Sequence, residues 1–187
     1  MKRILLLLLL ALPLYASPYT KAIFAGGCFW CMESDFEKVH GVVSVVSGYT
    51  GGRVVNPSYE QVSSGGTGHR EAVEVTYDPR IVTYGRLVDV FWRNIDPLDD
   101  SGQFCDKGEQ YTAAIFWSGE EQRRIAELSL ANAKKRFGGV ATKVLPAGPF
   151  YRAEEYHQDY YKKNPLHYRF YRATCGRDAR LKSVWGR

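Results

Sequence analysis

The sequence predicts an α+β fold, a single-domain two-layer sandwich of helices on a mixed, largely antiparallel sheet with a ferredoxin-like core. Segments with the alternating pattern of strands and segments with the periodicity of helices follow one another in mixed order. Neither an internal repeat nor a linker interrupts them. The 187 residues are 45% hydrophobic and 24% charged, which suits one folded domain and excludes a disordered chain.

The amino-terminal half supplies most of the predicted sheet. Residues 21–25 form an apolar run that ends at two glycines, as a strand does where it enters a tight turn. Thr83 has the side chain expected at the start of a helix. In chain order, we expect a strand over 21–25, a helix over 29–38 closed by Gly41, a strand over 42–49, a Gly- and Ser-rich loop over 63–68, a strand over 71–77, and the helix that follows Thr83.

The carboxyl-terminal half begins with a stretch that has no periodicity. Residues 94–110 are predicted to be a long loop, which in a compact domain is usually functional. The run Ser118-Gly119-Glu120-Glu121 has the pattern of a capping box. The remaining predicted elements are a strand over 112–117, an amphipathic helix from the capping box to Arg136, a strand over 140–145 and a helix over 153–164.

The first sixteen residues have the layout of a secretory signal peptide. Lys2 and Arg3 precede the apolar run 4–12, and Ala16 offers a small residue for cleavage. The prediction is a signal peptide over 1–16 and a catalytic domain over 17–187, with an uncleaved anchor as the alternative. We therefore expect an exported protein, periplasmic or secreted, with no stable membrane insertion after the signal is removed.

Charge and cysteine content narrow the function classes. The formal net charge is +5, of which Lys2 and Arg3 contribute two, and no basic stripe or nucleic-acid motif accompanies the rest. All four Cys follow residue 16, and in an exported protein they would meet conditions in which disulfides persist. The sequence thus predicts no nucleic-acid partner, and we expect a monomer.

The chemistry centres on Cys28. It stands where a strand turns into a helix, so the helix dipole and free N–H groups are expected to lower its pKa. Cys31 lies one turn further on the same face, where the two sulfurs can meet. A buried or disulfide-bonded structural pair is the alternative. A zinc site would need a second matching pair, whereas Cys105 and Cys175 are single and distant, so no metal is predicted.

The residues between these cysteines argue against a plain disulfide exchanger. Phe29 and Trp30 suit an apolar pocket beside the sulfur, and such a pocket would hold a small apolar group between two aromatic rings.

Six spaced motifs now point to one family. They are Gly27-Cys28-Phe29-Trp30, Gly48-Tyr49-Thr50-Gly51-Gly52, 56–62 (NPSYEQV), 67–73 (TGHREAV) with 77–79 (YDP), Asp106 with Gln110-Tyr111, and 153–160 (AEEYHQDY). In these motifs the sequence resembles the peptide methionine sulfoxide reductases of the A type, the methionine-S-sulfoxide reductases. The match runs from about residue 21 to 165.

The resemblance implies the reaction and its central residues. Cys28 would attack the sulfoxide sulfur and become a sulfenic acid as methionine is released. Glu71 would be the acid, with its pKa raised by an apolar pocket. Tyr59 and Tyr111 would donate hydrogen bonds to the sulfoxide oxygen.

The resemblance also implies how the substrate is held. Phe29 and Trp30 would hold the methyl group, while Asp106 and His157 would line the pocket and contact the substrate. His69, near the Gly-rich loop, is expected to be structural. The implied partners are oxidised proteins, peptides or free methionine sulfoxide, and a thioredoxin-like reductant, with no metal or organic cofactor.

The sequence departs from the family pattern where the enzyme would be regenerated. Cys31 stands where many members have Gly, and the carboxyl-terminal tail lacks the Gly-rich segment that often carries the resolving cysteine. Candidates for capturing the sulfenic acid are Cys31, Cys175 and Cys105, besides an outside thiol or a relay through several of them.

Two other functions remain open at this stage. An exported thiol–disulfide oxidoreductase would use Cys28 and Cys31 but has no use for Glu71, Tyr59 or Tyr111. An aromatic-pocket binding module with a structural disulfide would turn over no sulfoxide.

Overall fold

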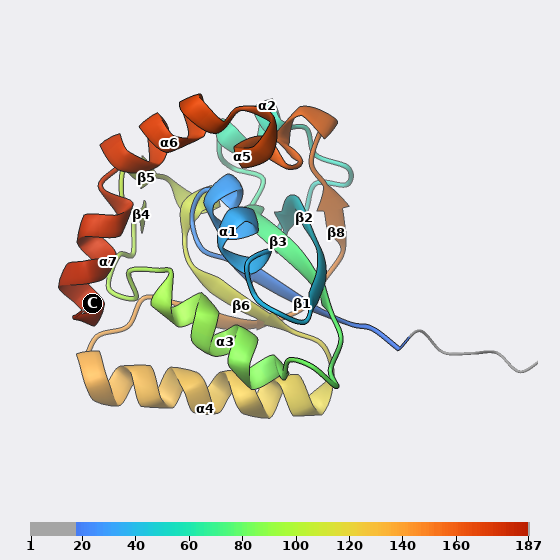
Figure 1. Ribbon diagram of the computed structural model, residues 1–187, viewed down its shortest axis with the longest axis vertical. Coiled ribbons are helices and arrows are strands. Elements are labelled where there is room, and N and C mark those ends of the chain that lie inside the picture. The colour runs from blue at the N-terminus through green and yellow to red at the C-terminus, as the bar shows by residue number, and fades with distance from the viewer. Residues whose placement is uncertain (1–17, 187) are drawn as a thin grey trace, which may run out of the picture.

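The computed structural model describes residues 18–186 (Figure 1). The predicted signal peptide over 1–16 lies outside the described residues. The strands are β1 (Thr20–Ala25), β2 (Val42–Thr50), β3 (Arg70–Tyr77), β4 (Gly102–Gln103), β5 (Asp106–Lys107), β6 (Ala114–Trp117), β7 (Lys143–Pro146) and β8 (Phe150–Arg152). The helices are α1 (Phe29–Phe36), α2 (Tyr59–Ser63), α3 (Tyr84–Arg93), α4 (Gly119–Phe137), α5 (Tyr160–Lys163), α6 (Pro165–Thr174) and α7 (Arg177–Trp185), with 3-10 turns η1 (Glu109–Tyr111) and η2 (Glu155–His157).

The main sheet has the order β7-β6-β1-β3-β2-β8. All its neighbouring strands are antiparallel except β6 and β7, which are parallel. Its four central strands, β6-β1-β3-β2, are joined in the chain as β1-α1-β2-β3-α3-β6, which is the ferredoxin-like arrangement. The predicted fold class, mixed and largely antiparallel, is therefore confirmed.

The helices cover one face of this sheet. Alternation along β1 sends Ala22 and Phe24 into the larger core and Ile23 and Ala25 into a smaller one on the opposite face. Phe24 stacks on Phe36 of α1 at 4.9 Å and on Phe91 of α3 at 5.5 Å between ring centroids, and all three are fully buried. Burying a side chain of this size contributes about 1.5–3 kcal/mol.

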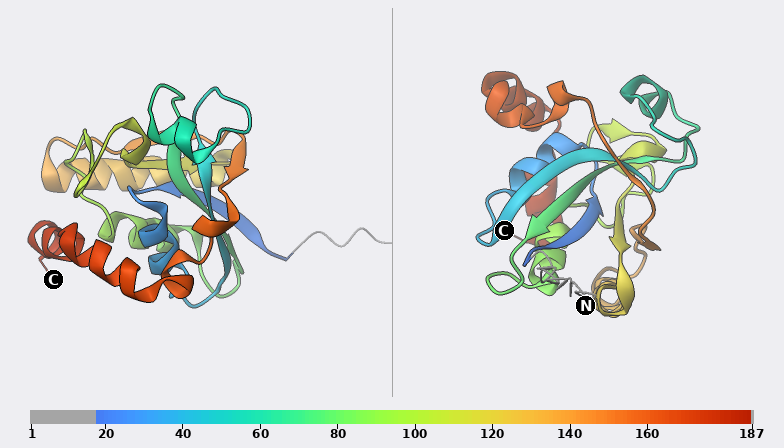
Figure 2. Two further views of the ribbon diagram at one scale, coloured as in Figure 1. Left: turned by 90° about the horizontal axis from the view of Figure 1, so that it is seen from above. Right: turned by 90° about the vertical axis from the view of Figure 1, so that its right-hand side faces the viewer.

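The opposite face is closed by the sheet itself. Ile23 and Phe116 pack there with Leu145 and Phe150, which come from the segments at the two ends of the strand order. The right-hand view of Figure 2 shows the sheet curling over this side. The domain therefore consists of two layers, the helices and the sheet.

The carboxyl-terminal helices were not predicted. Instead of one helix over 153–164, the chain forms η2 and α5, and α6 and α7 then run along one side of the domain (Figure 1). Pro165 does not prevent a helix, because it stands in the first turn of α6, where its missing N–H is not needed. Arg177 anchors α7, since its buried guanidinium donates to the Asn94 carbonyl at 2.7 Å and to the Gly26 carbonyl at 3.3 Å.

Two further expectations need correction. The stretch 94–110 is not a plain loop, because it contains the β4–β5 hairpin and enters η1. The predicted capping box at Ser118 is wrong: Ser118 is the N-cap of α4, but its side chain makes no capping bond, and its N–H donates to Gln122 Oε1 at 2.9 Å instead. A complete capping box occurs at α2, between Ser58 and Gln61.

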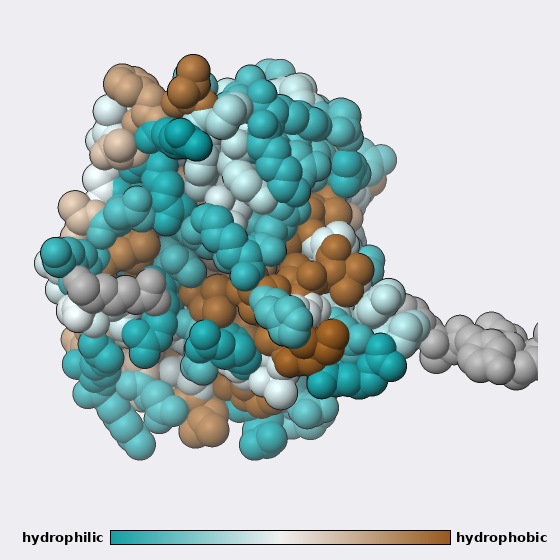
Figure 3. Space-filling model, viewed as in Figure 1, coloured by the Kyte–Doolittle hydropathy of each residue, from teal (hydrophilic) through white to brown (hydrophobic). Residues whose placement is uncertain are grey.

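The surface carries both polar and apolar side chains. Figure 3 shows one face as mostly hydrophilic, with apolar side chains gathered near its middle. Within residues 18–186 we find no helix with the length and apolar character needed to cross a membrane.

Candidate active site

Cys28 lies at the tight turn between β1 and α1, as predicted. It is the N-cap of α1, and Gly27 before it has φ +82°. The backbone here is packed too closely for side chains: a Cβ on Gly26 would lie 2.6 Å from Met32 Sδ, and one on Gly27 would lie 2.7 Å from Gln103 Cβ. The two glycines therefore permit both the turn and the packing that fix Cys28.

Cys28 and Cys31 are both free and buried. The Cys28 thiol donates a hydrogen bond to the Cys31 sulfur, which lowers the pKa of Cys31 to about 7. Burial, together with Cys31 and the nearby Glu71 carboxyl, raises the pKa of Cys28 well above its ordinary value. The lowered pKa expected from the helix dipole is thus outweighed by desolvation, and the resting Cys28 is a thiol.

Glu71 reaches the same turn from β3. It is 3% exposed, and its Oε2 accepts the N–H of Phe29 at 3.0 Å. Burial raises its pKa to about 8 despite that hydrogen bond, with Asp106 and Cys31 adding to the effect. Glu71 is therefore mainly a neutral acid at pH 7, with a proton to give.

A cavity of about 210 Å³ opens over these groups. It is lined by Cys28, Phe29, Trp30, Tyr59, Glu71, Asp106, Tyr111 and Tyr171. Larger hollows of about 400 and 430 Å³ lie elsewhere on the described surface, and neither is lined by a cysteine. The small cavity is the one in which acid, thiol and aromatic side chains meet, and its size suits a side chain rather than a large ligand.

The tyrosines come from short elements outside the core strands. Tyr59 opens α2, where its N–H donates to Glu154 Oε1 at 2.8 Å. Tyr111 ends η1, and its hydroxyl donates a hydrogen bond to the Tyr59 hydroxyl. Burial raises the pKa of both, so each keeps the proton needed to donate to a substrate oxygen.

Aromatic rings form one wall of the cavity. Trp30 stacks on Tyr160 with ring centroids 3.7 Å apart, and its Nε1 donates to His157 Nδ1 at 3.1 Å. His157 itself is 1% exposed, and burial lowers its pKa, so it is neutral. It does not line the cavity, and its contact is with the indole rather than with the space a substrate would fill.

His69 is structural, as expected. Its Nδ1 accepts the N–H of Gly52 at 3.1 Å, and its Nε2 pairs with the Val54 carbonyl at 2.7 Å. It thereby fastens the loop before α2 to the start of β3.

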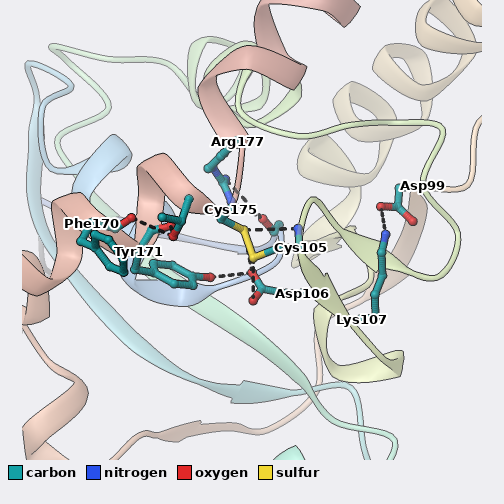
Figure 4. Close-up of a disulfide and its surroundings, with 10 residues drawn as sticks. Asp99, Cys105, Asp106, Lys107, Phe170, Tyr171, Cys175 and Arg177 are labelled. Carbon is teal, nitrogen blue, oxygen red and sulfur yellow. Dashed lines mark hydrogen bonds and ion pairs between the residues drawn. A yellow bond between two sulfur atoms is a disulfide. The ribbon is translucent and has the colours of Figure 1, made fainter.

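The other two cysteines are joined to each other. Cys105 and Cys175 form a disulfide across 70 residues of sequence, between the hairpin loop and the end of α6 (Figure 4). Asp106 follows Cys105 and lines the cavity, where its Oδ2 accepts the Tyr171 hydroxyl at 2.6 Å. The side-chain atoms of Cys105, Asp106 and Cys175 lie close enough together to hold a metal ion. With the disulfide formed, however, the two sulfurs are not available as thiolate ligands.

Comparison with known proteins decides the family. The model for the family described as "Peptide methionine sulfoxide reductase" matches residues 20–187. This chain belongs to that family.

Its relatives in this reductase family are similar over more than three quarters of their length. "Peptide methionine sulfoxide reductase MsrA 2" of Caulobacter vibrioides is 56% identical over 177 residues, covering 93% of this chain and 90% of the relative. The solved methionine sulfoxide reductase A of Corynebacterium diphtheriae is 34% identical, with a TM-score of 0.77 over 81% of this chain and 78% of that one. Mxr1 of Saccharomyces cerevisiae, solved in complex with Trx2, shares the fold at 23% identity, with a TM-score of 0.54 over 76% of this chain and 84% of that one.

Membership in the reductase family makes the chain an oxidoreductase, and the structure gathers most of the predicted site residues. Cys28, Glu71, Tyr59, Tyr111, Phe29, Trp30 and Asp106 all line one cavity. Sequence reasoning did not select Tyr171, which lines it too. A signal for it exists, since Tyr171 stands four residues before Cys175 and so shares a helix face with it.

Proposed function

We propose that this reductase converts methionine S-sulfoxide, free or in proteins and peptides, to methionine, with Cys28 as the nucleophile and Glu71 as the proton donor. The observation that carries this proposal is the 210 Å³ aromatic cavity, in which the Cys28 sulfur lies with a carboxyl group whose pKa is about 8 and with two tyrosines. A sulfoxide needs this combination, because its sulfur accepts a nucleophile only as its oxygen is protonated.

The first step then balances without an outside acid. The Cys28 sulfur takes the oxygen, the substrate S–O bond breaks, and methionine leaves with its sulfur lone pair. Glu71 gives its proton to the oxygen and receives the thiol proton, so it ends the step protonated, and Cys28 ends as a sulfenic acid. Tyr59 and Tyr111 donate to the oxygen while charge builds on it, and Phe29 and Trp30 pack on the methyl group.

Cys31 is proposed to resolve the sulfenic acid. It lies one helical turn from Cys28, is free, and has a pKa of about 7, lowered first by the Cys28 thiol and further by Arg177 and Arg172. Its attack forms the Cys28–Cys31 disulfide, breaks the S–O bond and releases water. Cys105 and Cys175 do not offer free thiols in this state, because they are bonded to each other.

The reducing equivalents are proposed to come from a thioredoxin-like dithiol. The complex of the yeast relative Mxr1 with Trx2 supports such a partner. Thiols supply both electrons, so the proposed cycle uses no metal or organic cofactor.

We also propose export to the periplasm or the exterior. The support is the signal-like composition of residues 1–16 and the Cys105–Cys175 disulfide, which suits an oxidising compartment.

A single-turnover experiment tests the reaction. The chain is fully reduced, freed of reductant and mixed with excess methionine S-sulfoxide, and methionine and remaining thiols are counted by mass spectrometry with peptide mapping. The expected result is one methionine per chain and a new Cys28–Cys31 disulfide, with no product from the R epimer. A second methionine with Cys105 and Cys175 also oxidised would instead establish a relay. Absence of methionine would overturn the proposal in favour of a thiol–disulfide oxidoreductase.

A further inference from the structure

Tyr171 of α6 has no part in the reaction described so far, yet its side chain enters the site. It lines the cavity with Cys28 and packs edge-on against Trp30, with ring centroids 5.8 Å apart and an interplanar angle of 80°. Its hydroxyl donates to Asp106 Oδ2 at 2.6 Å, and its side chain lines the cavity that the Cys28 sulfur also lines, where it acts to lower the pKa of that thiol. A hydroxyl group therefore stands between the nucleophile and a carboxyl group.

The Cys105–Cys175 disulfide links the segment that carries Tyr171 to the segment that carries Asp106. Cys175 lies one helical turn beyond Tyr171, and Cys105 immediately precedes Asp106. The Cys105 N–H also lies 3.2 Å from Cys175 Sγ. Figure 4 shows the Tyr171 side chain and Asp106 meeting beside the sulfur–sulfur bond. A covalent link placed here limits how far α6 can move from the Asp106 loop.

We propose that Tyr171 is a third catalytic tyrosine of this pocket, one that acts on the Cys28 sulfur rather than on the sulfoxide oxygen, and that the Cys105–Cys175 disulfide keeps it in place. The proposal rests on the proposed role of Cys28 as the nucleophile. It assigns to this disulfide a positioning role in place of a part in electron transfer.

The physical need for such a group follows from burial. A thiolate formed in a dry pocket has lost its water and requires a donor, and hydrogen bonds to charged acceptors are the stronger ones. Burial, Cys31 and Glu71 all raise the pKa of Cys28, whereas the Tyr171 hydroxyl acts to lower it. The single Tyr171 proton is donated to Asp106 Oδ2 at 2.6 Å in the resting site, so it must turn to the Cys28 sulfur when a thiolate forms there. The titratable groups around Cys28 are Cys31 of α1, Glu71 of β3, Tyr59 of α2, Tyr111 of η1, Tyr171 of α6 and Asp106 of β5.

The test is a titration of Cys28 alone. In the Cys31→Ser chain with the Cys105–Cys175 disulfide intact, Cys28 is the single free thiol. Its ionisation is followed by thiolate ultraviolet absorbance and by the pH dependence of alkylation. Tyr171→Phe is expected to raise the pKa of Cys28 by about one unit, which lowers the thiolate fraction about tenfold below that pKa. Tyr161→Phe is the matched control, because its hydroxyl bonds Glu37 outside the cavity, and it should leave the titration unchanged.

A second variant tests the disulfide. Adding Cys105→Ser and Cys175→Ser to the Cys31→Ser chain leaves Cys28 as the single cysteine, and the titration is expected to shift in the same direction as with Tyr171→Phe. Single-turnover sulfoxide reduction should slow by up to about tenfold while still yielding one methionine. Selective chemical reduction of the disulfide in the otherwise intact chain gives the same readout if the double substitution prevents folding.

Each part can be overturned separately. An unchanged Cys28 titration in Tyr171→Phe overturns the role of Tyr171, even if the rate falls, since a purely structural or substrate-binding role would alter only the rate. An unchanged titration without the disulfide overturns the positioning role. Failure of the proposed function is distinct, because the parent chain would then release no methionine whatever the titration shows.

Discussion

The two cysteine pairs of this molecule lie around one cavity and differ in almost every physical respect. Cys28 and Cys31 are three residues apart on one buried turn of helix and are free thiols. Cys105 and Cys175 are 70 residues apart, join a hairpin to a terminal helix near the surface, and are disulfide-bonded. Only Cys28 lines the cavity. The comparison teaches that a place on the buried helical turn beside the cavity, rather than the number of thiols nearby, separates the proposed reactive pair from the disulfide-bonded pair.

The largest expected effect follows from removing Cys31. Cys31→Ser should still release one methionine in a single turnover, because Cys28 and Glu71 remain, but steady-state turnover with a thioredoxin-like reductant should fall to background. Mass spectrometry should find a sulfenic acid on Cys28. Sustained turnover would show that the comparison of the two pairs is wrong and that a thiol outside the first pair resolves the intermediate.

Removing the acid should have the next largest effect. Glu71→Gln keeps the side-chain shape but removes the proton, and general acid catalysis contributes about 10²- to 10⁴-fold in rate. In the parent chain, activity should fall as pH rises through about 8, where Glu71 ionises. The pH profile of single-turnover reduction, measured for the parent and for Glu71→Gln, checks the rate loss and the pH dependence. A Glu71→Gln chain with the parent's rate would refute the assignment of Glu71 as the proton donor.

Replacing the same carboxyl group should lower activity but raise stability at high pH. Its folded-state pKa of about 8 exceeds its ordinary value of 4.5, so its contribution is full below about pH 4.5 and is lost as pH rises through 8. Glu71→Gln should therefore be more stable than the parent at pH 9, by roughly a few kcal/mol, and differ less at pH 5. Urea unfolding at the two pH values measures this, and an equal difference at both would contradict it.

The second pair should matter more for stability than for turnover. Opening a loop of 70 residues costs about 4 kcal/mol in the chain-entropy model, so Cys105→Ser with Cys175→Ser should lower the free energy of unfolding by up to that amount. Sulfoxide reduction should continue at a reduced rate. Unaltered stability together with lost turnover would contradict this prediction, because Cys105 and Cys175 would then be needed for the reaction rather than for the fold.

The smallest expected effect concerns the aromatic wall. His157→Phe removes the acceptor of the Trp30 N–H and should cost about 1 kcal/mol, or a few-fold in KM, with kcat little changed. Steady-state kinetics checks this. A loss in kcat matching that of Glu71→Gln would mean that His157 acts on the substrate directly.

The two cysteine pairs also differ in how much of their surroundings could be predicted from the sequence. The Cys28 side of the cavity was predictable, because the turn, Phe29 and Trp30 lie in one local motif and the resemblance to the family pointed to Glu71. The pairing of Cys105 with Cys175 was not, since four cysteines admit several pairings and spacing does not choose among them. Helices α6 and α7 were missed because their helical form depends on tertiary contacts such as that of Arg177 with Gly26 and Asn94, which local sequence does not reveal. Tyr171 was missed with them.

The place of α6 in the chain has a consequence for the order in which the enzyme is assembled. Cys28 and Glu71 are synthesised well before Tyr171 and Cys175, which follow β8 in the chain. Until they arrive, the cavity lacks the part of its lining that Tyr171 supplies, and Cys105 lacks its disulfide partner. Contacts between residues this distant in sequence carry a larger loop-closure entropy cost than local contacts do. The correct pairing thus depends on α6 docking before an oxidant joins the wrong sulfurs, because until then Cys105 is a free thiol beside the Cys28–Cys31 pair in the same chain.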